Sequence, residues 1–89
     1  MKIKSGFVLE EVGGTYLAVA VGERAEEFRV LIRLNGTGAF LWGIIAESDV
    51  DEETLVDRMK DKYGIDTATA SRDVSIFVAK LREGGLLDE

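Results

Sequence analysis

The side chains of this sequence that could do acid–base chemistry are carboxylates, and several of them occur as adjacent pairs. These pairs are Glu10-Glu11, Glu26-Glu27 and Glu52-Glu53. General acid–base catalysis needs two carboxylates that converge in one cleft. Neighbouring residues on a strand point to opposite faces, so a pair on a strand does not converge. The pairs therefore indicate a solvated acidic surface rather than a catalytic site.

Other catalytic residue types are missing. The sequence contains no Cys and no His, which excludes thiol nucleophiles, imidazole-based mechanisms, disulfides and zinc sites of the Cys/His type. It also shows no phosphate-binding loop and no metal-ligating motif. We therefore expect that the protein is not an enzyme, and that it binds no metal ion and no cofactor.

The length and the net charge of the chain reduce the number of possible functions. The chain has 89 residues, which is enough for a single small domain over 1–89. Its net charge is −6; residues 1–47 carry five basic and six acidic side chains, and residues 48–89 carry six and eleven. Nucleic-acid-binding faces usually have the opposite sign. No apolar run approaches the roughly 20 residues of a membrane span. We expect a cytoplasmic protein that binds neither nucleic acid nor membrane.

The elements that must position any site divide the chain into two parts. Residues 1–34 alternate with period 2, and residues 35–85 follow a period near 3.6. Strands are predicted over 3–12, 15–21 and 28–34, with a hairpin at Gly13-Gly14 and a loop over 22–27.

Three capping residues then mark three helices. Asn35, Asp51 and Asp66 are good N-caps and predict helices over 36–47, 52–63 and 67–83. The fold class is therefore α+β, with a three-stranded antiparallel sheet followed by three helices in a winged helix-turn-helix-like arrangement. That outline alone leaves a DNA-binding transcription regulator as an alternative function.

A specific motif lies at the junction between the two parts. The run Leu34-Asn35-Gly36-Thr37-Gly38-Ala39-Phe40-Leu41-Trp42 closely resembles the LNxTGAFLW motif of the PqqD family. Weaker matches follow at Arg72-Asp73-Val74, Phe77, Leu81 and Gly85-Leu86-Leu87. One departure is Gly36, where relatives commonly carry a charged or polar residue. The resemblance covers nearly the whole chain.

This resemblance implies a peptide chaperone, also called a RiPP recognition element. Such proteins bind the leader segment of a ribosomally synthesised precursor peptide and present it to a maturation enzyme, commonly a radical S-adenosylmethionine (SAM) enzyme. The leader adds as an extra strand to the edge of the third strand, beside the third helix. Because that edge is otherwise open, we expect a monomer or a weak homodimer.

The expected peptide-binding residues come from these two elements. They are Phe28, Arg29, Val30, Leu31, Ile32 and Arg33 on the strand, and Arg72, Asp73, Ile76, Phe77 and Lys80 on the helix. Residue type leaves two roles open for Arg29 and Arg33, which either discourage casual strand pairing or attract an acidic leader. The sequence also does not decide which face of the third strand lines the peptide groove. Trp42 is interpreted as a core residue, with a surface anchor for the partner enzyme as the alternative.

Overall fold

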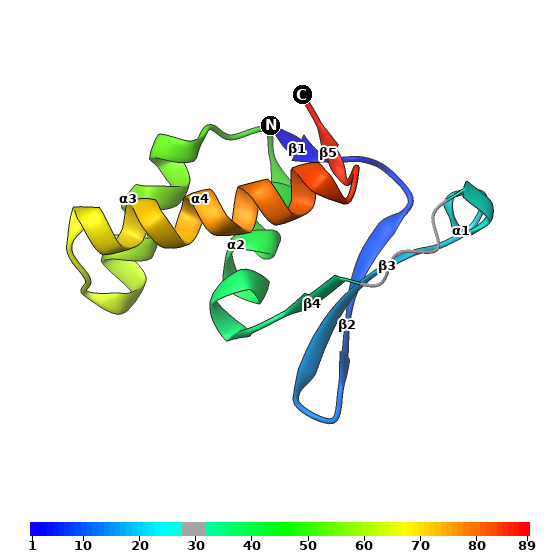
Figure 1. Cartoon of the computed structure of the whole chain (residues 1–89), viewed down its shortest axis with the longest axis horizontal. Coiled ribbons are helices and arrows are strands. Elements are labelled where there is room, and N and C mark those ends of the chain that lie inside the picture. Colours follow the sequence, from blue (N-terminus) through cyan, green and yellow to red (C-terminus); the bar gives the residue numbers. More distant parts are fainter. Residues whose placement is uncertain (28–31) are drawn as a thin grey trace.

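The computed structural model describes residues 1–27 and 32–89. The main sheet is antiparallel, has the order β2-β3-β4, and consists of β2 (Phe7–Val12), β3 (Thr15–Ala20) and β4 (Ile32–Leu34). The long helices are α2 (Gly36–Glu47), α3 (Glu52–Tyr63) and α4 (Thr67–Glu83). They gather on one side of the molecule, and the β2–β3 hairpin projects away from them (Figure 1). The predicted fold class, a three-stranded antiparallel sheet followed by three helices, is confirmed.

Each long helix begins at a predicted cap. The side-chain oxygens of Asn35, Asp51 and Asp66 each accept a hydrogen bond from the main-chain N–H three residues later, at 2.8, 2.8 and 2.7 Å. These bonds satisfy amide groups that the first turn of a helix leaves without a partner. Gly64 ends α3 in the left-handed conformation, with φ of 64°, which glycine adopts without a steric penalty.

The prediction of one continuous strand over 3–12 is wrong. Gly6 has φ of 90° and breaks the strand, because this conformation does not continue a β-ladder. The part before the break, β1 (Lys2–Ile3), pairs instead with β5 (Leu87–Asp88) in a separate two-stranded sheet. Both ends of the chain consequently lie side by side (Figure 1).

The loop predicted over 22–27 contains a helical turn. This turn is α1 (Arg24–Glu27), and it follows Gly22, whose φ is 63°. The main-chain N–H of Ala25 donates to the carbonyl of Gly22 at 3.1 Å. The polar composition suggested a loop, but Arg, Ala and Glu all favour helical backbone, and four residues suffice for one turn.

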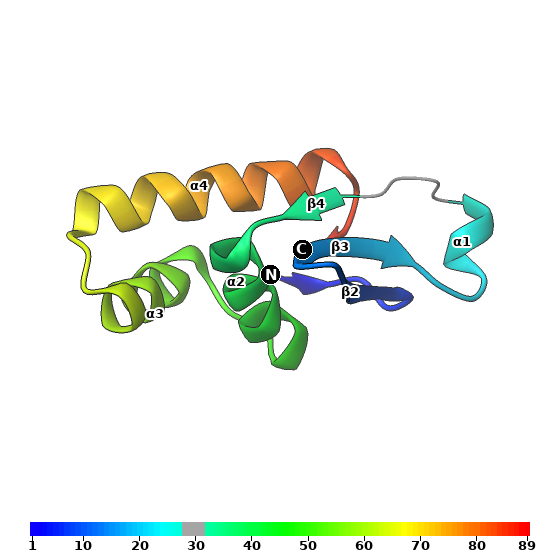
Figure 2. The ribbon, with the colours of Figure 1, turned by 90° about the horizontal axis from the view of Figure 1, so that it is seen from below.

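The core lies between the sheet and the helices. Its fully enclosed large side chains come mostly from the helices and include Leu41, Ile45, Leu55, Met59, Val74, Val78 and Leu81. The strands of the main sheet contribute Phe7, Ala18, Ile32 and Leu34. Trp42 is buried as well, in agreement with its interpretation as a core residue. Figure 2 shows α4 extending past β4, so that this helix and the end strand of the sheet lie next to each other.

No helix in the described parts of the chain combines the length and the apolar character needed to cross a membrane.

Candidate functional site

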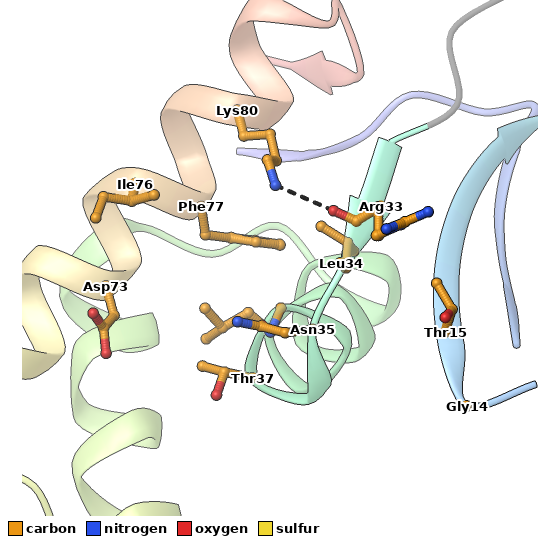
Figure 3. Close-up of a pocket in the computed structure, with 12 residues that line it drawn as sticks. Gly14, Thr15, Arg33, Leu34, Asn35, Thr37, Asp73, Ile76, Phe77 and Lys80 are labelled. Atoms are coloured by element: carbon orange, nitrogen blue, oxygen red, sulfur yellow. Dashed lines mark hydrogen bonds between the residues drawn. The ribbon is translucent and has the colours of Figure 1, made fainter.

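A groove lies between β4 and α4, with a volume of about 570 Å³. Figure 3 shows residues from four parts of the chain converging on it. Its lining consists of Gly14, Thr15, Arg33, Leu34, Asn35, Thr37, Gly38, Leu41, Asp73, Ile76, Phe77 and Lys80. This is a volume that can accommodate a few side chains of an extended peptide.

The strand wall of the groove is the end strand of the main sheet. Among the described residues, β4 pairs with β3 and with no other strand. Its central residue, Arg33, has an exposed side chain and lies opposite Leu17 of β3. The flanking residues Ile32 and Leu34 are buried, at 7% and 5% exposure. This alternation determines which side chains of Ile32–Leu34 face the core, because one face of the strand must pack against the helices.

One contact bridges the strand and the helix across the groove. The Lys80 Nζ atom donates a hydrogen bond to the main-chain carbonyl oxygen of Arg33 at 3.1 Å, as drawn in Figure 3. The carbonyl of Arg33 therefore points toward α4. In an antiparallel strand the N–H and C=O of one residue point to the same side. Arg33 thus presents its main chain to the groove rather than to β3.

The helix wall is one face of α4. Asp73, Ile76, Phe77 and Lys80 are spaced i, i+3, i+4 and i+7, so they follow one another along the helix. Phe77 is buried, with 5% exposure, and connects the groove to the core. Ile76 is 61% exposed, which gives the groove an apolar rim.

The start of α2 also lines the groove. Asn35 and Thr37 line it beside Gly38, whose main-chain N–H donates to Asn35 Oδ1 at 2.8 Å. A Cβ atom at position 38 would lie 3.1 Å from Leu34 Cβ, a distance at which either residue would have to move. Glycine at this position therefore permits the close approach between β4 and the first turn of α2.

The predicted site residues fall into three groups. Arg33, Asp73, Ile76, Phe77 and Lys80 all line the groove. Two others do not: Ile32 packs in the core, and Arg72 is exposed beside the groove with its Nε atom 3.6 Å from Asp73 Oδ1. Phe28, Arg29, Val30 and Leu31 lie outside the described residues.

Sequence reasoning missed the remaining lining residues. They are Gly14, Thr15, Leu34, Asn35, Thr37, Gly38 and Leu41. Five of them belong to the Leu34–Trp42 motif. This motif indicated the family, and its residues were not predicted to belong to the site. Its position directly after the end strand was a signal that these residues lie near the groove.

The lining of the groove is mixed in chemical character. It combines apolar side chains with two cations, Arg33 and Lys80, and Asp73 is the one carboxylate among the described lining residues. A single carboxylate provides no carboxylate pair for acid–base catalysis. In residues 1–27 and 32–89, no group of three or more acidic, His or Cys side chains is arranged to hold a metal ion.

Comparison with known proteins adds to this geometry. The family model of coenzyme PQQ synthesis protein D (PqqD) matches residues 8–87. A solved structure, described as TbiB1 in complex with the TbiA(beta) leader peptide, has a TM-score of 0.75 and 23% sequence identity, with 99% of this chain and 95% of that chain covered. This likeness shows that the two chains share a fold. No curated protein sequence matches the chain. The family match extends from β2 to the start of β5 and covers nearly the whole chain, which therefore belongs to the PqqD family.

Proposed function

We propose that this protein binds the leader segment of a ribosomally synthesised precursor peptide and presents it to a maturation enzyme. The leader adds to β4 as a further antiparallel or parallel strand and fills the groove between β4 and α4. The observation that carries this proposal is the groove itself, which lies directly beside the end strand of the sheet. The protein acts by binding and carries out no chemistry of its own.

The backbone of β4 supplies the sequence-independent part of the binding. The Arg33 carbonyl points into the groove, where it accepts a side-chain hydrogen bond from α4. An added strand satisfies such edge groups with main-chain hydrogen bonds and requires little change in the native fold. The predicted binding strand also includes Phe28 to Leu31, which lie outside the described residues.

The side chains of α4 supply the selectivity that main-chain pairing lacks. Ile76 is the most exposed large apolar side chain among the described residues, at 61%, and it lies on the rim of the groove. A peptide side chain packed against it removes this apolar surface from water. Arg33 and Lys80 place positive charge at the groove, although the whole chain has a net charge of −6.

Two observations support the proposed partners. TbiB1, which shares the fold, has been solved with a leader peptide, and this supports a leader as the ligand here. Membership of the PqqD family supports a radical SAM enzyme as the maturation partner. Duplex DNA is a poorer ligand, because Asp66, Asp73 and Glu83 on and before α4 offset its basic residues.

The test is a titration with synthetic leader segments, taken from the short open reading frames beside this gene and followed by amide chemical shifts. Shifts are expected in Ile32–Leu34 and along residues 73–80 of α4. The variant Ile76→Ala should weaken binding by about fivefold, because it removes apolar contact area at the rim. Val12→Ala is the matched control, since Val12 is 59% exposed and does not line the groove.

Two results would count against the proposal. One is a set of shifts confined to α3, with β4 and the groove face of α4 unchanged. The other is retardation of duplex DNA in a gel at concentrations at which no leader peptide binds.

A further inference from the structure

We infer that Lys80 occupies a main-chain acceptor on the edge of β4 in the free protein and favours the binding of peptides that carry a carboxylate. This inference rests on the proposed function and adds the chemistry by which the same groove distinguishes one peptide from another. Its basis is the hydrogen bond from Lys80 Nζ to the Arg33 carbonyl, together with the exposed position of the lysine on the groove face of α4.

The lysine occupies a position that an added strand requires. A strand paired with β4 would place its own main-chain nitrogen about 2.9 Å from the Arg33 carbonyl oxygen. Lys80 Nζ lies 3.1 Å from that oxygen and so takes the place of the missing amide. Natural edge strands often carry lysine, because the charge discourages pairing with unrelated chains. Here the lysine comes from the neighbouring helix and satisfies the main-chain acceptor directly.

Binding of a strand must therefore break the hydrogen bond between Lys80 and the Arg33 carbonyl. The new partner of the Lys80 ammonium group then determines which peptides bind well. A neutral peptide takes the carbonyl and leaves the ammonium group beside the groove without a partner from the peptide. A peptide with Asp or Glu facing Lys80 replaces the lost bond with a charge-assisted one. Asp73, two helical turns earlier on the same face, disfavours a carboxylate at the other end of the groove.

The charge of Lys80 consequently has opposite effects on two classes of peptide. It opposes neutral peptides, since they compete with it for the Arg33 carbonyl. It favours acidic peptides, since they gain an ion pair after its release. A lysine that only maintained the fold would affect both classes in the same direction.

The experiment is a selection followed by a double-mutant cycle. A displayed library of random 12-residue peptides is selected against the wild-type protein and against Lys80→Met, which retains most of the apolar stem. Wild-type selections should be enriched in peptides with Asp or Glu, and selections against the variant should not. A selected acidic peptide and its Asp→Asn or Glu→Gln analogue are then titrated into both proteins.

We expect Lys80→Met to change the affinities for the acidic and the neutral peptide in opposite directions. Relative to wild type, Lys80→Met should bind the acidic peptide about threefold more weakly and the neutral analogue about threefold more tightly, a size typical of exposed charge pairs. Lys60→Met, on α3 and away from the groove lining, makes the same change in net charge and should alter neither affinity.

The possible failures can be told apart by mapping the amide shifts of the selected peptide. Shifts at β4 and α4 combined with equal effects of Lys80→Met on both peptides would overturn the role of Lys80 and leave the proposed function standing. Wild-type selections without acidic enrichment would do the same. Shifts elsewhere on the protein would overturn both.

Discussion

Gly84, which caps the C-terminal end of α4, lies against the side chain of Ile32 on β4. A Cβ atom at position 84 would be 2.7 Å from Ile32 Cδ1 and 2.9 Å from Leu86 Cδ1. The backbone of Gly84 has φ of −77°, which any residue can adopt, so a substitution here acts through the end methyl groups of Ile32 and Leu86 and not through backbone strain. This contact sets how closely the end of α4 approaches β4, and these two elements form the walls of the groove.

Replacing Gly84 with Ala should destabilise the protein. The added methyl group forces Ile32 and Leu86 out of their positions, and overpacking of this kind typically costs about 1–3 kcal/mol. Urea unfolding, followed by the fluorescence of Trp42, measures the loss; Trp42 is the single tryptophan and is buried. Because Ile32 belongs to β4, peptide affinity should fall as well. An unfolding midpoint equal to that of wild type would show that both side chains move away without strain.

Replacing Gly43 with Ala should have the opposite effect on stability. Gly43 lies inside α2 and is exposed, and apart from its chain neighbours and the backbone of its own helix no described atom lies within 4 Å of the place that a Cβ would take. Alanine there restricts the unfolded chain and favours the helix by about 0.5–1 kcal/mol. The same unfolding assay should show a higher midpoint with unchanged peptide affinity. A lower midpoint would contradict the open surroundings of this residue.

Acid should weaken the protein partly through two helix caps. The main-chain N–H of Thr54 donates to Asp51 and thereby lowers the pKa of that carboxyl, and the N–H of Thr69 lowers the pKa of Asp66 in the same way. Since each pKa is lower in the folded state, the stabilisation is fully present above the unfolded pKa of about 3.9. It is lost as the pH falls through the folded pKa.

The double variant Asp51→Asn with Asp66→Asn isolates this contribution. Asparagine caps a helix about as well as aspartate but does not titrate. Urea unfolding from neutral pH down to about pH 3 should therefore show a smaller loss of stability for the variant than for wild type across the Asp range. Parallel curves would mean that other carboxylates, such as Asp49 beside the N-terminal amine, dominate the acid response.

Local signals in the sequence were sufficient for the long helices and for the fold class. An N-cap acts on amides three residues away, so Asn35, Asp51 and Asp66 could be recognised without knowledge of the rest of the chain. The same holds for the end of α3 at Gly64. The groove face of α4 was also predictable in part, because helical spacing places Asp73, Ile76, Phe77 and Lys80 together.

The tertiary structure decided the features that depend on distant partners. The first predicted strand divides because residues 2–3 find a partner in β5, at the other end of the chain, and no local pattern encodes that pairing. The lining of the groove combines the hairpin at Gly14 with the start of α2. Lys80 and Arg33 are separated by 47 positions; their hydrogen bond exists only because α4 packs beside β4. Residue type alone identified both as cations, and only their packing showed that one of them covers the main-chain acceptor of the other.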